Sequence, residues 1–118
     1  MLSLFEIEYY EENGRFPVFE FIQGLTPKEQ AKILREIDLL KEFGLALGLP
    51  HIKKMQGDYN SLWELRVKQS TNDFRIFYFA VSGGKFVLLH AIRKTSEKTP
   101  KRQLETSLNR MKNYLRRM

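Results

Sequence analysis

Residues 74–92 read FRIFYFAVSGGKFVLLHAI, and this stretch decides the fold. Its first eight residues are apolar on nearly both faces, which is typical of a central strand buried on both sides. Residues 82–84, Ser-Gly-Gly, supply a turn, and residues 85–92 are again rich in strand-forming side chains. The pattern predicts an antiparallel hairpin in the middle of a sheet.

The stretches before this hairpin predict further strands. Residues 62–67, LWELRV, predict a strand with Glu64 and Arg66 on its outward face, because successive side chains point to opposite faces. Residues 51–60 are expected to form a loop. Near the start of the chain, residues 4–10 alternate between apolar and acidic side chains and predict a short strand.

Three helices complete the predicted fold. A short helix covers residues 17–22 and opens with a proline. A longer helix begins after the N-cap Thr26, which has a glutamate three residues later as in a capping box, and ends at Gly44. A last helix opens at Thr99-Pro100. The order predicts an α+β fold in one domain, 1–118, with helices on one face of a small antiparallel sheet and the other face open.

Charge is distributed unevenly along the chain, whose net charge is +6. Residues 1–50 carry nine acids and five bases, a net of −4. Residues 51–118 carry five acids and fifteen bases, a net of +10. Such asymmetry indicates nucleic acid or an acidic protein as partner. The alternative is a solvated basic surface.

The composition excludes several classes of site. With no cysteine and two histidines, disulfides are excluded and a zinc site is disfavoured. The chain has no Gly-rich phosphate loop, no G-x-S-x-G and no acidic cluster for a two-metal nuclease, so neither cofactor nor metal is expected. Its start lacks the features of a signal peptide and no run is apolar enough to span a bilayer, which favours the cytoplasm and no membrane partner.

Basic side chains recur at the ends of the predicted strands. If the register allows, Arg66, Arg75 and the pair Arg93-Lys94 gather at one end of the sheet. Arginine forks bind phosphate in a bidentate way, and interleaved aromatic side chains can stack bases. Such a cluster suits RNA.

The arginines also have a structural interpretation. Arg66 can simply pair with Glu64 or Asp73. Arg75 lies in an apolar strand, where it can be a partly buried, hydrogen-bonded arginine instead of a phosphate ligand.

The histidines and the remaining lysines have such alternatives too. His90, expected on one face with Phe86 and Leu88, can be a core histidine with satisfied hydrogen bonds instead of a catalyst. His51 is expected at the surface, and Lys53-Lys54 can be a solvated pair. The basic last helix can be a solvated face, a nucleic-acid arm or a docking surface.

A nuclease with these residues has a metal-independent route. The RNA 2′-hydroxyl attacks the adjacent phosphate, which requires a base, an acid for the leaving oxygen and cations for the developing charge. Arginine and lysine supply the cations, while His90 or a lysine with a lowered pKa supplies the proton transfers.

Five motifs stand in order: LWELR at 62–66, FRIFY at 74–78, LLHA at 88–91, RKT at 93–95 and KTP at 98–100. Together they resemble the phage-derived HigB branch of the RelE/ParE toxin superfamily over nearly the whole chain. The resemblance implies the toxin of a type II toxin–antitoxin system, an mRNA endoribonuclease that usually depends on the ribosome. It also implies a hetero-oligomer with a HigA-like helix-turn-helix antitoxin.

The resemblance gives the basic residues roles. Arg66 and Arg75 match arginines for phosphate binding and transition-state charge, His90 matches the candidate base, and Lys94 is a candidate proton donor. RNA contacts are expected from the other basic residues: Lys53, Lys54, Arg93 and Lys98. Arg93 replaces a lysine common in the family, and arginine cannot transfer protons near neutral pH, so that task falls to Lys94 or Lys98.

Two other functions fit the same fold. A ParE-like protein would inhibit DNA gyrase by binding alone. A non-catalytic RNA-binding module would bind RNA in a salt-dependent way and cut nothing. His90 in the last predicted strand and the basic pair after it favour the nuclease.

Overall fold

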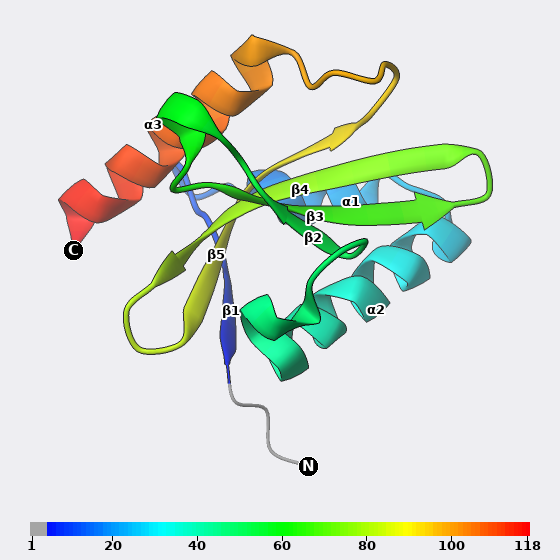
Figure 1. Ribbon diagram of the computed structural model, residues 1–118, viewed down its shortest axis with the longest axis horizontal. Coiled ribbons are helices and arrows are strands. Elements are labelled where there is room, and N and C mark those ends of the chain that lie inside the picture. The colour runs from blue at the N-terminus through cyan, green and yellow to red at the C-terminus, as the bar shows by residue number, and fades with distance from the viewer. Residues whose placement is uncertain (1–4) are drawn as a thin grey trace.

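The computed structural model describes residues 5–118 and confirms the α+β fold class. In chain order the elements are β1 (Glu6–Tyr9), α1 (Pro17–Gln23), α2 (Pro27–Phe43), β2 (Ile52–Lys54), β3 (Trp63–Gln69), β4 (Asn72–Val81), β5 (Lys85–Arg93) and α3 (Lys101–Arg117), with 3-10 turns at Gly44–Leu47 and Gly57–Tyr59 (Figure 1). Leu4, the first residue of the predicted opening strand, lies outside the described residues. Within residues 5–118, no helix has the length and apolarity needed to cross a bilayer.

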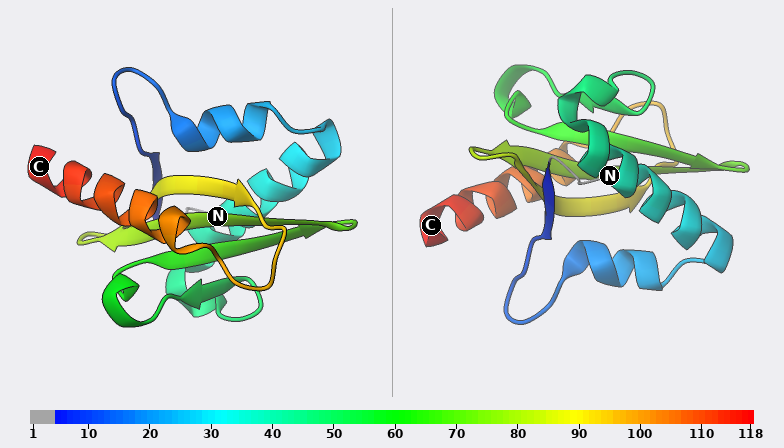
Figure 2. Two further views of the ribbon diagram at one scale, coloured as in Figure 1. Left: turned by 90° about the horizontal axis from the view of Figure 1, so that it is seen from above. Right: turned by 90° about the horizontal axis from the view of Figure 1, so that it is seen from below.

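The five strands form one sheet in the order β1-β5-β4-β3-β2. The predicted antiparallel hairpin of β4 and β5 is confirmed, and β4 is the central strand. The sheet is mixed and not purely antiparallel, because β1 pairs with β5 in parallel. Seen from above and below, α1 lies beside the β1–β5 edge and β2 forms the opposite edge (Figure 2).

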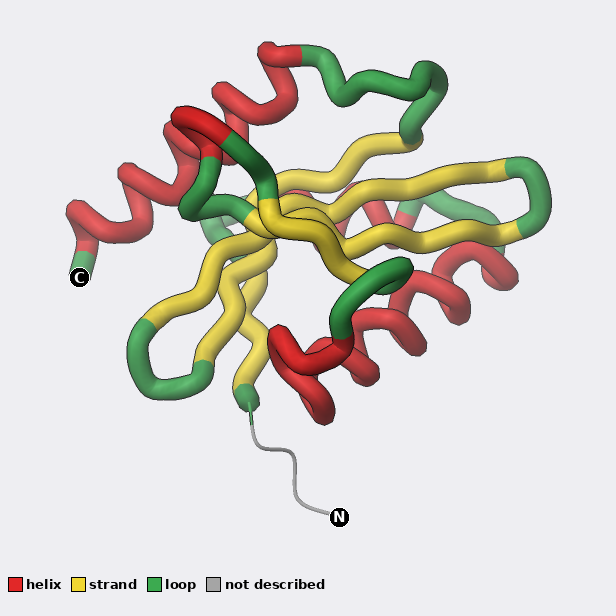
Figure 3. The backbone as a smooth tube through the Cα atoms, viewed as in Figure 1, coloured by secondary structure: helices red, strands yellow, loops and turns green. Residues whose placement is uncertain are grey.

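The prediction of a loop over residues 51–60 is wrong for Ile52–Lys54, which forms the edge strand β2. This segment has one buried apolar side chain followed by two exposed lysines, too short a pattern to reveal a strand. The segment becomes a strand because it pairs with β3: Ile52 lies opposite Leu65, and Lys53 lies opposite Glu64. The tube trace shows β2 lying along β3 (Figure 3).

Helices cover both faces of the sheet, so the prediction of helices on one face only is wrong. Helices α1 and α2 bury a core that includes Ile33 and Ile76. Helix α3 lies on the other side, where Met111 packs with Phe79 and Leu89 (Figure 1). The reason is visible in β4 and β5, which are apolar on both faces and require a cover on each. The end of the sheet beyond α3 stays open.

A β-bulge in β5 changes which side chains share a face. The register runs from Phe77 opposite His90 to Tyr78 opposite Leu88, so Leu89 is the extra residue. The bulge puts His90 on the α3 side, while Leu88 joins the core under α1 and α2. The prediction that His90 shares a face with Phe86 and Leu88 is therefore wrong.

The N-terminus of α2 is fixed as predicted. Thr26 and Glu29 form a capping box: the Glu29 amide donates to Thr26 Oγ1 over 3.2 Å, and the Thr26 amide donates to Glu29 Oε1 over 3.0 Å. The helix ends at Gly44, whose φ of 60° is unfavourable for other residues, and a Cβ there would lie 2.6 Å from the Phe5 ring.

Candidate functional site

Two arginines face each other on the sheet surface that α3 leaves open. Arg66 of β3 is paired with Arg75 of β4 across the strands. Like charges directly opposite are unfavourable unless a counter-charge is present. Glu64 supplies it, because its Oε1 lies 3.5 Å from Arg66 Nε and 3.4 Å from Arg75 Nε. This carboxylate is only 4% exposed, so it is held between the two guanidinium groups.

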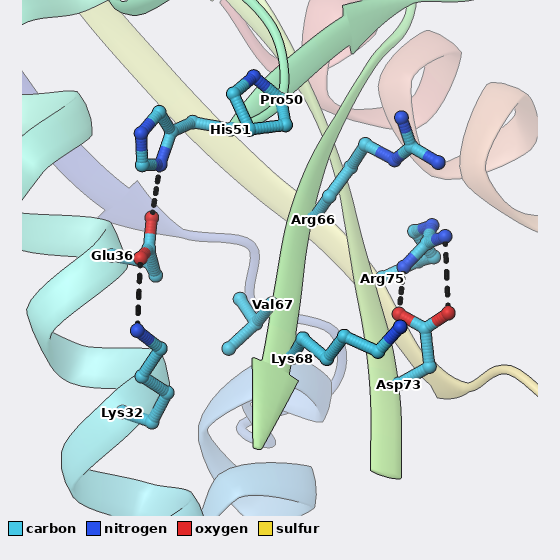
Figure 4. Close-up of a pocket in the computed structure, with 9 residues that line it drawn as sticks. All are labelled: Lys32, Glu36, Pro50, His51, Arg66, Val67, Lys68, Asp73 and Arg75. Atoms are coloured by element: carbon cyan, nitrogen blue, oxygen red, sulfur yellow. Dashed lines mark hydrogen bonds and ion pairs between the residues drawn. The ribbon is translucent and has the colours of Figure 1, made fainter. Parts of the chain in front are cut away.

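Arg75 is buried and turned toward protein partners. It is 4% exposed, donates to both carboxylate oxygens of Asp73, and donates to the Phe74 carbonyl over 3.1 Å. The structural interpretation of Arg75 thus describes its geometry: its terminal nitrogens are engaged, and a phosphate could reach them only by displacing Asp73 (Figure 4).

Arg66 is the more accessible of the two. Its side chain is 34% exposed, and its Nε lies 3.5 Å from Glu64 Oε1. Within residues 5–118, its two terminal nitrogens make no hydrogen bond to protein. Glu64 therefore orients the guanidinium while its fork remains available for an anion. Figure 4 shows the Arg66 side chain beside that of Arg75.

Lys94 joins this pair from the end of β5, where its backbone N–H donates to the Asp73 carbonyl over 2.6 Å. Burial lowers the pKa of the Lys94 amine, and the positive charges of Arg75 and Arg66 lower it further, against the opposing effect of Glu64 and Asp73. A lysine with a lowered pKa releases its proton more readily than an exposed one.

Two hollows meet at Lys94. The first, here called the arginine hollow, is lined by Arg66 and Arg75 together with Lys68 and Asp73. The second, here called the lysine hollow, lies between β2 and the start of α3 and includes Glu64. Both are also lined by Glu97, and the lysine hollow includes three of the predicted RNA-binding residues: Lys53, Lys54 and Lys98. The open face is thus a continuous, mainly basic groove.

Arg93 does not belong to this groove. Alternation along β5 sends its side chain to the opposite face, where its guanidinium stacks 4.9 Å from the Phe74 ring centre and approaches Glu29 to 3.5 Å. The structure therefore brings Arg66, Arg75 and Lys94 together, and separates Arg93 from them.

His90 is held by α3. Its Nε2 lies 2.5 Å from Gln103 Oε1, and its Nδ1 lies 3.1 Å from a terminal nitrogen of Arg110. Since Gln103 offers an acceptor and Arg110 a donor, the proton is assigned to Nε2 and the ring is neutral. Burial lowers the His90 pKa, and the Arg110 charge adds to this effect while the Gln103 hydrogen bond opposes it. Among the described residues, those lining the two hollows do not include His90.

Of the two acidic partners expected for Arg66, Glu64 pairs with it, whereas Asp73 pairs with Arg75. Glu64 and Asp73 each lie two residues from an arginine on the same strand face, which places them within reach. His51, expected at the surface, has a side chain that is 37% exposed, and its Nδ1 lies 3.0 Å from Glu36, a nearly buried carboxylate of α2 (Figure 4). Throughout residues 5–118, no three His, Asp or Glu side chains come together as a set that could hold a metal ion.

The chain is similar to known proteins. Residues 20–112 match the family described as "Phage derived protein Gp49-like (DUF891)". Two curated proteins, each named "Probable endoribonuclease HigB1", from Mycobacterium tuberculosis strains CDC 1551 / Oshkosh and ATCC 25618 / H37Rv, are 40% identical to the chain over 65 residues. The match covers 55% of this chain and 49% of each relative, so the chain spans about half the length of these relatives. The family match covers most of the chain and includes every strand of the open face, and the chain therefore belongs to the phage-derived Gp49-like protein family.

Proposed function

We propose that the protein is a toxin of a type II toxin–antitoxin pair and acts as an endoribonuclease on mRNA bound to the ribosome. The observation that carries the proposal is the accessible Arg66 fork beside Lys94, an amine with a lowered pKa, in a basic groove. The name of the two relatives, probable endoribonuclease, supports the same activity.

The proposed chemistry is an attack of the RNA 2′-hydroxyl oxygen on the adjacent phosphorus. The bond from phosphorus to the 2′ oxygen forms, and the bond to the 5′ oxygen of the next nucleotide breaks. Arg66 binds the phosphate and stabilises the charge that develops on it. Protonated Lys94 gives its proton to the departing 5′ oxygen. Glu64 and Arg75 hold Arg66 in place through the contacts described above.

In this mechanism His90 removes the 2′-hydroxyl proton, and it can do so only after Arg110 leaves its Nδ1. The free lone pair of the ring is on Nδ1, where Arg110 now donates. Accepting a proton from RNA therefore requires that the bound strand displace Arg110 from His90. A neutral histidine with a lowered pKa is in the correct state to act as a base.

The proposed partner is a HigA-like antitoxin that neutralises the toxin by covering the groove. An antitoxin that binds and leaves Arg66 and Lys94 accessible would contradict neutralisation by blocking this site.

Mapping the 5′ ends of transcripts in cells that express the protein tests the proposal. We expect new ends inside translated reading frames with the wild type and with the control Arg35→Ala, which changes an exposed arginine of α2. Arg66→Ala should reduce cleavage by roughly 100-fold or more, as expected for loss of a charge-stabilising donor. Thermal unfolding checks that both variants fold. Growth arrest with intact transcripts would contradict the nuclease proposal and would favour gyrase inhibition.

A further inference from the structure

The lysine hollow has a different chemical character from the arginine hollow beside it. Its walls include two largely apolar side chains from separate elements, Met55 after β2 and Leu104 in the first turn of α3. Gln56, which is exposed, also lines this hollow. These two apolar side chains stand among charged and polar ones, and they offer a surface against which a flat ring can pack.

The two hollows are alike in charge, because each is lined by four basic and two acidic side chains. In the lysine hollow the acidic side chains are Glu64, which lies between the two arginines, and the exposed Glu97. A carboxylate repels a phosphate, but it accepts hydrogen bonds from the amino groups of bases. The lysines on β2 and in the loop before α3 can still contact a backbone that passes the rim.

Lys94 and Glu97 line both hollows, so the two cavities adjoin. Phosphate and base of one nucleotide are joined through a single ribose. A phosphate at Arg66 and Lys94 therefore leaves a neighbouring base within reach of the lysine hollow. Single-stranded RNA is recognised in this way, with bases splayed out into pockets and read along their edges.

We propose that the lysine hollow is a nucleobase pocket that determines which nucleotide lies next to the cleaved phosphate. Met55 and Leu104 contact the faces of the ring, and the polarisable thioether of Met55 suits an aromatic surface. The Gln56 amide, which can donate and accept at once, pairs with the base edge. The inference rests on the proposed ribonuclease function and adds a specificity determinant to it.

Cleavage mapping with Gln56→Leu tests the pocket. The matched control is Gln23→Leu, which changes an exposed glutamine on α1, far from the hollow in the chain. We expect Gln56→Leu to alter the nucleotide preference at one position beside the cut by roughly fivefold or more, the lower end for one amide–base pair. Gln23→Leu should retain the wild-type preference.

Each other result has a definite meaning. Cleavage by Gln56→Leu with the wild-type preference overturns the pocket and leaves the nuclease proposal intact. Absence of cleavage by the wild type overturns the nuclease proposal and, with it, this inference.

A binding measurement covers the case in which Gln56→Leu fails to cut. The whole labelled chain is titrated with ribose 5-phosphate and with the four nucleoside 5′-monophosphates, and NMR follows the Met55 methyl and the Gln56 side-chain amide. We expect the nucleotides to shift both signals and ribose 5-phosphate to shift neither, while both kinds of ligand perturb Lys94. Equal shifts with ribose 5-phosphate, or no shift with any nucleotide, overturn the pocket.

Discussion

At the scale of single residues, Lys94 combines two properties that proton transfer requires. It lines the arginine hollow with Arg66, Arg75 and Asp73, and its pKa is lowered first by burial and then by the neighbouring guanidinium charges. An ordinary lysine holds its proton too firmly to donate it efficiently near neutral pH. The same arginines that bind phosphate thus prepare the donor beside them.

This arrangement predicts the pH dependence of cleavage. If protonated Lys94 is the donor, the rate falls as pH rises through its lowered pKa, at a pH below the ordinary lysine value of 10.5. Lys94→Arg keeps the charge but cannot release a proton, so cleavage should fall roughly 100-fold to 10,000-fold while RNA binding is retained. Cleavage of ribosome-bound mRNA across the neutral and alkaline range measures both effects.

The control for this prediction is Lys41→Arg, the same change at an exposed position of α2. Its rate and pH profile should match the wild type. A Lys94→Arg protein that cuts at the wild-type rate would show that the proton comes from elsewhere.

The two arginines show what the sequence could and could not reveal at this scale. Alternation correctly predicted that Arg66 and Arg75 gather at one end of the sheet. The apolar strand around Arg75 made a buried, hydrogen-bonded arginine one of two interpretations, and the hydrogen bonds from Arg75 to Asp73 decide between them. For Arg93 the prediction of a place in the cluster is wrong. Neighbouring side chains on a strand point to opposite faces, so Arg93 lies over Phe74 on the face opposite to Lys94.

At the scale of elements, Glu29 connects the N-terminus of α2 to the sheet. Besides its role in the capping box, its Oε2 accepts a hydrogen bond from Asn72 over 2.7 Å and approaches Arg93 to 3.5 Å. The hydrogen bond from the Thr26 amide is the main cause of its lowered pKa, with smaller contributions from the Thr26 side chain and Arg93 against the effect of burial. The helix dipole also favours a negative charge at this end.

Because the pKa of Glu29 is lowered in the folded protein, the stability that Glu29 contributes depends on pH. Because the folded pKa lies below that of the unfolded chain, the contribution is complete above about 4.5 and is lost as pH falls through the folded value. Glu29→Gln should therefore be less stable than the wild type at neutral pH, and the difference should shrink on acidification. Urea unfolding at several pH values measures this, with Glu42→Gln on the same helix as control. A difference that grows toward low pH would contradict the assignment.

Helices and strands with a long hydrophobic pattern could be predicted from the sequence, and those with a short pattern could not. Strands β3, β4 and β5 and all three helices follow from periodicity and caps. Strand β2 and the bulge at Leu89 do not, because both depend on pairing with another segment. The bulge matters for function: one extra residue turned His90 from the core under α1 and α2 toward Gln103 and Arg110 of α3.

At the scale of the whole molecule, the charge asymmetry along the chain becomes an asymmetry between faces. The acidic excess of the first part lies mainly in β1 and the loop after it, and α2 carries as many bases as acids. The basic second part builds the groove strands and α3, which lies across the sheet from α1 and α2 (Figure 1). A polyanion is therefore attracted to one side of the protein, which raises the frequency of productive encounters. Sequence alone gave the charge difference, but its placement required the topology.

This two-sided distribution predicts which charges contribute to the salt dependence of RNA binding. For single strands, the logarithm of the binding constant falls with the logarithm of salt concentration by about 0.7 for each neutralised phosphate. Lys98 lies exposed in the groove, whereas Lys28 is an exposed lysine of α2 on the other side. Lys98→Gln should reduce the slope by about 0.7, and Lys28→Gln should leave it unchanged. Fluorescence anisotropy of a labelled single-stranded RNA at increasing KCl measures both slopes. Equal slopes for the two variants would mean that RNA does not follow the groove, and that the positive charge acts only as a diffuse field around the protein.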